Sequence, residues 1–211
     1  DSPFLVDGTE EMLAYDKLPI RCNNEKGLVV EKEDNPRWIS LGNNTISSEK
    51  STIRITLDTT SMDAMALVNI QNTEYESLMT RNKFKNDSLK IKEFYDDKIG
   101  EILKLQTIGY NNTNRPYSMD FETIYETEKL GDNIVLKPFL NLPLAKNSLT
   151  QKKRTYPIDF IYPWEKEFES ILEIPSGFYV SKLPGDYNFE NELAEINLNY
   201  SLDDSTLKVK G

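Results

Sequence analysis

Regular alternation of apolar and polar residues runs through the second half of this chain and limits its fold more than any other feature. In residues 117–125, Tyr, Met, Phe, Thr and Tyr occupy every second position, and residues 194–202 repeat the pattern before a turn and a last short strand. Residues 158–164 and 168–174 alternate as well, with residues 163–167 as a link. A period of two sends successive side chains to opposite faces of a strand. The sequence therefore predicts strands with one buried and one solvated face, ending in a hairpin.

The first half of the chain mixes strand and helix patterns. Residues 53–57 alternate, and residues 64–70 are expected to pair with them across a turn. In residues 73–97, large apolar side chains recur at spacings of three and four among Lys, Glu and Asp, which indicates two short amphipathic helices. Asp87 or Ser88 is the expected N-cap of the second helix.

These patterns predict a mainly β fold in three parts. We expect an irregular segment over residues 1–47, a small α+β portion over residues 48–98, and an immunoglobulin-like β-sandwich over residues 99–211. The polar stretch Leu140–Arg154 is expected to be a long connecting loop.

Charge and composition exclude several classes of partner and chemistry. A formal net charge of −10 argues against nucleic acid and anionic lipid, and no segment is apolar for the ~18 residues of a membrane helix. The chain has no histidine, which removes the usual general base and the commonest transition-metal ligand. Cys22 is the lone cysteine, so no intrachain disulfide forms. We expect no cofactor and no metal, and no catalysis that needs histidine.

Other candidate sites have simpler explanations. Acidic doublets are frequent among 35 Asp and Glu residues, and adjacency does not give the facing carboxylates of a glycosidase. The calcium-binding pattern of an EF-hand is absent. Most aromatic residues lie on the apolar side of a predicted strand, where large rings fill a core. Tyr15, Tyr110 and Tyr187 stand beside turns, so they are the candidates for an exposed aromatic surface, and a carbohydrate-binding module is one alternative function.

Two passages resemble a family of large exported bacterial proteins, typical of Bacteroidetes, in which a transglutaminase-like domain lies between two β-domains. Residues 4–30, FLVDGTEEMLAYDKLPIRCNNEKGLVV, are similar to the end of that transglutaminase-like domain and the segment after it. Residues 154–184, RTYPIDFIYPWEKEFESILEIPSGFYVSKLP, are similar to the last β-domain, and Arg81 stands where the family often has an arginine.

The resemblance implies that Asp7 holds the position of the acid in a Cys-His-Asp triad. Its partners would lie upstream, and Cys22 lies downstream, so the triad is incomplete in these residues. We therefore expect Asp7 to accept hydrogen bonds in the turn at Gly8-Thr9. The resemblance implies a non-catalytic, exported accessory domain, periplasmic or on the cell surface, that packs on an adjacent transglutaminase-like domain or binds an unidentified protein or glycan. The alternative is one part of a cysteine peptidase or transglutaminase-type enzyme whose Cys and His lie outside this chain.

Overall fold

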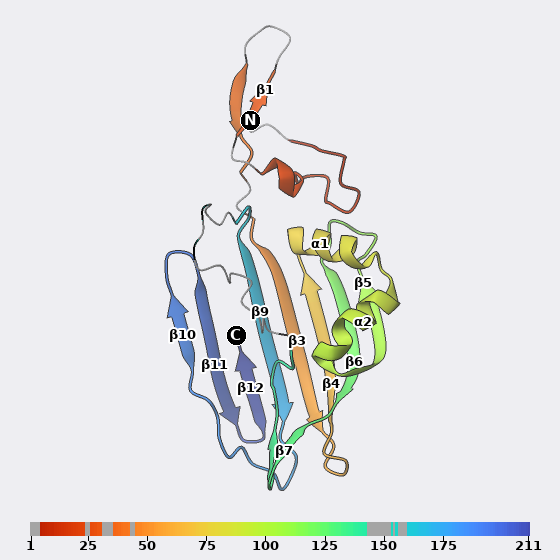
Figure 1. Ribbon diagram of the computed structural model, residues 1–211, viewed down its shortest axis with the longest axis vertical. Helices are drawn as coiled ribbons and strands as arrows, with labels where there is room; N and C mark the ends of the chain where they lie inside the picture. Colours follow the sequence, from red (N-terminus) through yellow and green to blue (C-terminus); the bar gives the residue numbers. More distant parts are fainter. Residues whose placement is uncertain are drawn as a thin grey trace.

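A computed structural model describes residues 5–23, 26–30, 36–42, 45–142, 153, 155 and 160–211. Within these residues, eight strands form one mixed sheet in the order β10-β11-β12-β9-β3-β4-β6-β5, and the hairpins β1–β2 and β7–β8 are separate from it (Figure 1). The strands of the large sheet are β3 (Ser47–Leu57), β4 (Ala64–Asn72), β5 (Glu101–Ile108), β6 (Tyr117–Tyr125), β9 (Trp164–Glu173), β10 (Tyr187–Glu190), β11 (Glu195–Asp203) and β12 (Thr206–Lys210). The other elements are a 3-10 helix (Ile20–Cys22), β1 (Lys26–Val29), β2 (Arg37–Ser40), α1 (Glu74–Phe84), α2 (Ser88–Ile99), β7 (Glu128–Leu130) and β8 (Asn133–Val135).

Strand β3 joins the two halves of the sheet. It pairs antiparallel with β4, which follows it directly, and parallel with β9, which follows more than a hundred residues later. A parallel pair needs a crossover connection, and here α1, α2 and five strands lie within it. Ser51, Ile53 and Ile55 of β3 point to the same side and are almost fully buried. The strand that joins the two halves of the sheet therefore presents a buried side to the core.

Helices α1 and α2 lie over β4, β6 and β5, on the side that we call the front face (Figure 1). Asp87 caps α2 as predicted, because its carboxylate accepts the N–H groups of Leu89 and Lys90 at 3.0 and 3.3 Å. The main core fills the space between helices and sheet, and its buried residues include Ile53, Ile55, Val68, Ile70, Phe84, Ile91, Tyr95, Ile99, Tyr117, Met119 and Phe121.

The predicted fold class is confirmed, since the chain is mainly β with one large sheet and two short helices. The hairpins predicted around residues 53–70 and 194–209 are present as β3–β4 and β11–β12, and α1 and α2 occupy the predicted helical region. Over the large sheet, the second layer expected of a sandwich consists, in the described residues, of the two helices and the β7–β8 hairpin (Figure 1). No helix or strand of the described residues lies over β10 and β11.

One detail differs from the sequence prediction. The link predicted at residues 163–167 is wrong, because Trp164–Glu173 is one continuous strand held along its length by β3. Strand β6 pairs with β4 on one side and with β5 on the other, so the sheet contains strands from both sides of the boundary predicted between residues 98 and 99. Most of the predicted loop Leu140–Arg154 lies outside the described residues, as do residues 156–159.

Candidate functional site: an uncovered apolar face of the C-terminal strands

The front side of β10, β11 and β12 carries a continuous row of apolar side chains. Residues that pair directly across neighbouring strands share a face, and the register links Tyr187 to Leu198 and Phe189 to Ile196. It also links Leu202 to Leu207, which in turn pairs with the core-facing side of β9. We call this surface the C-terminal apolar face, and its residues are Tyr187, Phe189, Ile196, Leu198, Tyr200, Leu202 and Leu207.

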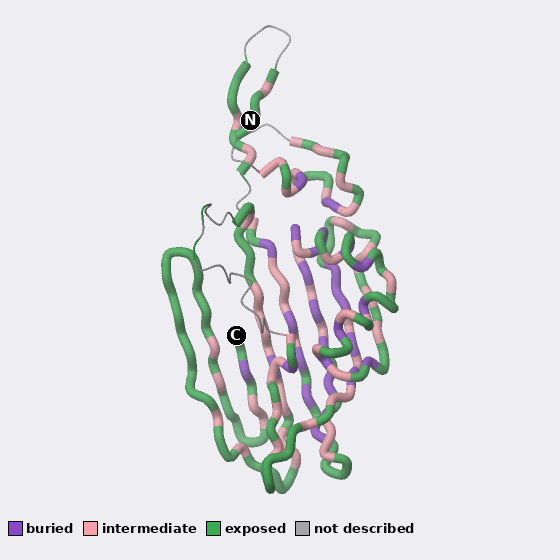
Figure 2. Tube along the Cα trace, in the orientation of Figure 1, coloured by how far each residue is buried: buried purple, intermediate pink, exposed green. Residues whose placement is uncertain are grey.

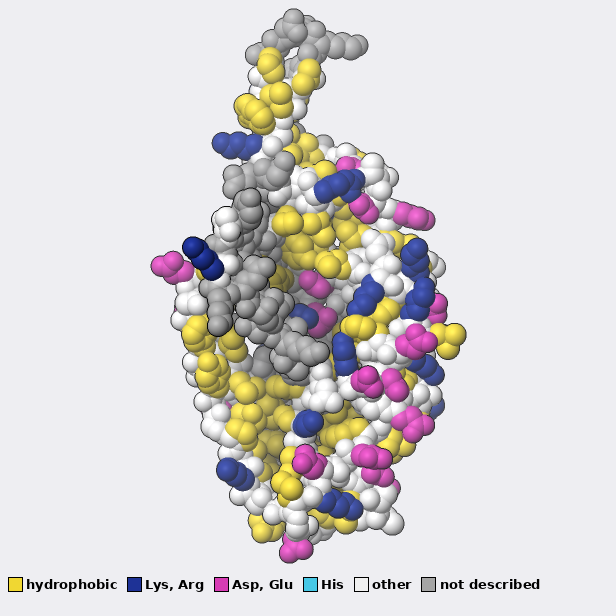
Figure 3. Space-filling model, in the orientation of Figure 1, with side chains coloured by type: hydrophobic (Ala, Val, Ile, Leu, Met, Phe, Trp, Pro, Cys, Tyr) yellow, Lys and Arg dark blue, Asp and Glu magenta, His cyan; other side chains and the backbone are white. Residues whose placement is uncertain are grey.

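This face is open to solvent, although it continues the side of the sheet that forms the core. Tyr187 is 54% exposed, Ile196 52%, Leu202 47% and Phe189 42%. Figure 2 shows the change along the sheet, from buried strands β3, β4 and β6 to exposed strands β10 and β11. Figure 3 shows apolar side chains gathered over the same strands. A surface of this kind on a soluble protein commonly marks an interaction site.

A groove adjoins the C-terminal apolar face. Its volume is about 470 Å³, and it lies between the face, the β7–β8 hairpin and the loop that precedes β10. Apolar side chains dominate its lining, among them Ile134, Leu136, Phe178, Val180, Tyr200 and Leu207. The groove extends the apolar surface from the sheet toward β8.

The opposite face of the same strands is polar and carries ion pairs. Glu167 of β9 accepts from the ammonium groups of Lys50 at 3.0 Å and Lys210 at 3.2 Å, from the strands on either side. The hydrogen bond from Lys50, followed by that from Lys210, lowers the pKa of Glu167. Asn197 and Ser201 of β11 are exposed on this side. Of the two faces of these strands, the front face is therefore the apolar one.

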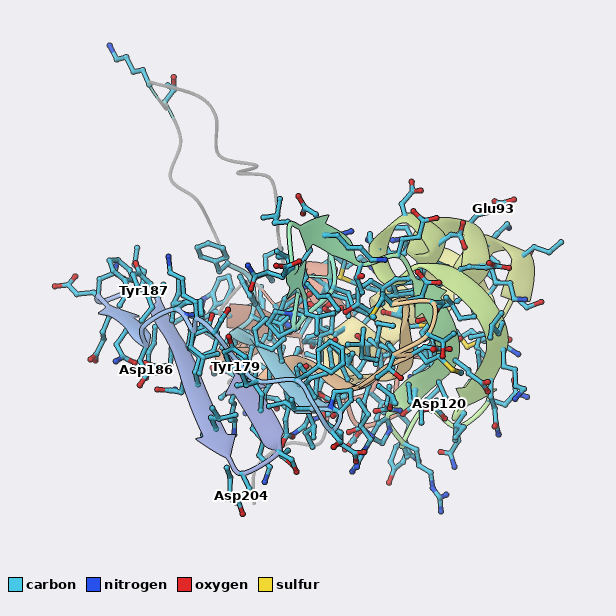
Figure 4. The ribbon with its side chains drawn as sticks, turned by 90° about the horizontal axis from the view of Figure 1, so that it is seen from below. Glu93, Asp120, Tyr179, Asp186, Tyr187 and Asp204 are labelled. Atoms are coloured by element: carbon cyan, nitrogen blue, oxygen red, sulfur yellow. The ribbon has the colours of Figure 1, made fainter. Side chains whose placement is uncertain are left out.

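Residues 174–205 carry a net negative charge. Lys182 is the one basic residue of this segment, against six acidic residues. The acidic residues are Asp186, Glu190, Glu192, Glu195, Asp203 and Asp204. Figure 4 places Asp186 and Tyr187 at the β10 side of the molecule, opposite Asp120 of β6 and Glu93 of α2.

Asp7 lies in a turn, as expected. Its Oδ1 accepts the amide N–H of Thr9 at 2.8 Å and the Thr9 hydroxyl, and its Oδ2 lies 3.8 Å from both Arg21 Nη2 and Cys22 Sγ. The two hydrogen bonds from Thr9 lower the pKa of Asp7, and the charge of Arg21 adds to their effect. The carboxylate is thus engaged by its own segment of chain.

The three tyrosines singled out in the sequence do not form one surface. Tyr15 is 65% exposed in the N-terminal segment, and Tyr187 lies on the C-terminal apolar face. Tyr110 is half-buried, packs against the main core and meets the Tyr117 ring at a centroid distance of 6.1 Å. Sequence reasoning found Tyr187 but missed Phe189, Ile196 and Leu202, because their alternation predicts one face without showing what covers it.

The described part of the chain contains no group of three or more His, Cys, Asp or Glu side chains placed to hold a metal ion. No helix among the described residues is long and apolar enough to cross a membrane.

Comparison with known proteins gives one family match. Residues 132–211 match the family described as "Domain of Unknown Function with solved-structure structure (DUF3858)". The matched segment contains β9 to β12, and so contains all of the C-terminal apolar face, whereas β3, the parallel neighbour of β9, lies outside it. No curated protein and no solved structure matches the chain. The match assigns no activity to residues 132–211, so their surface is the best guide to their role.

Proposed function

We propose that this chain is a non-catalytic accessory domain of an exported transglutaminase-like protein, and that its C-terminal apolar face binds another protein domain. The exposure of four large apolar side chains on one side of β10 and β11 carries the proposal. Burying such a surface is worth roughly 25 cal/mol per Å² of apolar area, so covering it by a partner is favourable. Because the opposite face of these strands is polar, we expect the partner to bind on the front face only.

The state of Asp7 supports a structural role for that residue. Its oxygens are engaged by Thr9, Arg21 and Cys22, and the chain has no histidine for it to orient. A carboxylate that serves a cysteine nucleophile does so by holding an imidazole. In the proposal, the binding surface and not Asp7 is the functional part of the chain.

The partner that we propose is the transglutaminase-like domain of the same protein. The similarity of residues 4–30 to the end of such a domain supports this choice. The family match of residues 132–211 is to a domain without an assigned function. The same resemblance supports export to the periplasm or the cell surface.

The test begins with the reading frame upstream of Asp1. We expect it to encode an export signal and a transglutaminase-like domain, which is then purified and titrated with this chain by calorimetry. Ile196→Glu and Leu202→Glu each place a charge on the C-terminal apolar face and are expected to weaken binding by at least about tenfold, which is ~1.4 kcal/mol.

The matched controls lie on the polar side of the same strand. Asn197→Glu and Ser201→Glu add the same charge one residue away and are expected to change the affinity by less than about twofold, because these side chains point away from the face. Equal losses from both pairs of variants, or a frame without a transglutaminase-like domain, would contradict the proposal.

A further inference from the structure

The large sheet ends at two edge strands, β5 and β10, and these edges differ. The ladder of β5 with β6 shifts register between Ile102 and Lys104, and such a bulge protects an edge against further pairing. The ladder of β10 with β11 is regular over all four residues, and each of them is exposed. Among the described residues, β10 is therefore the edge prepared to accept another strand.

The outward backbone groups of β10 follow from its pairing. The amide of Asn191 donates to the carbonyl of Ala194 at 2.9 Å. Hydrogen-bonded and non-hydrogen-bonded pairs alternate along an antiparallel ladder, so Phe189 bonds toward β11, and Asn188 and Glu190 direct their N–H and C=O groups toward the open edge. Unpaired groups of this kind form the template for β-strand addition.

The chemistry of an added strand is set by the two faces of β10. Side chains of the guest that lie opposite Tyr187 and Phe189 share the front face, where apolar groups extend the C-terminal apolar face. Side chains opposite Asn188 and Glu190 share the other face. No ion pair joins Glu190, Glu192 or Glu195 to a Lys or Arg of the described residues, so their charges are available to a cationic guest.

We propose that β10 accepts an extended segment of a partner protein, with apolar side chains alternating with Lys or Arg, as a further strand of the sheet. The inference deepens the proposed function, on which it rests, by stating how a partner of the C-terminal apolar face is held. A second copy of this chain is a poor guest, because antiparallel pairing of two β10 strands brings Glu190 of one copy beside the acidic residues of the other, and each chain carries a net charge of −10.

The experiment uses a peptide of four Lys-Val repeats with blocked ends and a fluorescent label, and a matched peptide of Glu-Val repeats. Fluorescence anisotropy with the full chain is expected to show that the Lys-Val peptide binds at least about tenfold more tightly. Asn188→Pro removes the outward N–H of β10 without removing a bond to β11, and is expected to weaken binding by at least about tenfold. Asn188→Ala keeps the N–H and is expected to bind like the original chain.

A further variant distinguishes loss of the binding edge from misfolding of the Asn188→Pro variant. Glu190→Arg is expected to weaken binding of the Lys-Val peptide and strengthen binding of the Glu-Val peptide, which loss of structure does not do. Equal binding of both peptides, or unchanged binding by Asn188→Pro, overturns the inference, as does concentration-dependent pairing of the chain through β10 in sedimentation.

The test of strand addition can fail independently of the test of the proposed function. If Asn188→Pro leaves peptide binding unchanged while Ile196→Glu still weakens binding of the transglutaminase-like domain, strand addition is wrong and the binding face stands. If Ile196→Glu leaves domain binding intact, the proposed function itself fails.

Discussion

At the scale of single residues, Arg81 shows how a buried charge can be held without a carboxylate. It is 1% exposed, and its Nη2 donates to the carbonyls of Gly109, Asn112 and Arg115 at 2.9, 3.0 and 2.7 Å. Its guanidinium carbon also lies 5.7 Å from the centre of the Tyr117 ring. Burial lowers the pKa of Arg81. Hydrogen bonds to the three carbonyl oxygens favour its charged form. One side chain on α1 therefore fixes the loop between β5 and β6.

Replacement of Arg81 is expected to destabilise the fold by removing this anchor. Arg81→Met leaves three carbonyls without their donor and should lower the free energy of unfolding by about 2–4 kcal/mol. Arg81→Lys retains the charge on a shorter side chain and should lose less. Urea unfolding at neutral pH measures both, and amide exchange in residues 109–116 should accelerate in both variants. A loss below about 0.5 kcal/mol for Arg81→Met would show that Arg81 does not hold the loop.

At the scale of elements, Gly100 makes the junction between α2 and β5. Its φ is 89°, and a Cβ at this position would lie against the Ile124 carbonyl oxygen of β6. Gly100→Ala therefore combines an unfavourable backbone conformation with a clash, and is expected to cost about 2–4 kcal/mol. Gly177→Ala has a similar φ of 88° with open space around it and should cost about 1 kcal/mol. Gly185→Ala has neither problem and is the control. Thermal unfolding should rank the three variants in this order.

Local patterns predicted most of the helices and strands, because strand alternation and helix capping depend on residues that are close together in the sequence. The hairpins β3–β4 and β11–β12 and the Asp87 cap were all predictable in this way. The parallel contact of β3 with β9 was not, because it joins residues far apart in sequence and no local signal specifies it. The candidate site was missed for a related reason. Alternation in residues 194–202 marks one apolar face, and only the arrangement of the other described elements shows that none of them covers it.

At the scale of the whole molecule, the sequence predicts a domain boundary near residue 98, and strands from both sides of that position belong to one sheet. Strand β6 pairs with β4, and β9 pairs with β3, across the predicted boundary. The family match over residues 132–211 likewise separates β9 from β3. If the sheet is a single cooperative unit, neither residues 99–211 nor residues 132–211 contain enough of it to fold alone. Both segments lack β3, so β9 would become an exposed edge strand.

This argument predicts how fragments of the chain behave. A fragment of residues 99–211 is expected to lack a cooperative unfolding transition in circular dichroism, because it has neither β3 nor β4. A fragment of residues 45–211 retains all eight strands of the sheet and is expected to unfold in one transition. Its midpoint should lie below that of the full chain, because the fragment loses the packing of Leu13 on Tyr75 and Leu78. The comparison controls for loss of the N-terminal segment, which both fragments lack. Cooperative unfolding of the 99–211 fragment would instead establish that the predicted β-domain is independent and that the β3–β9 contact is an interface between two domains.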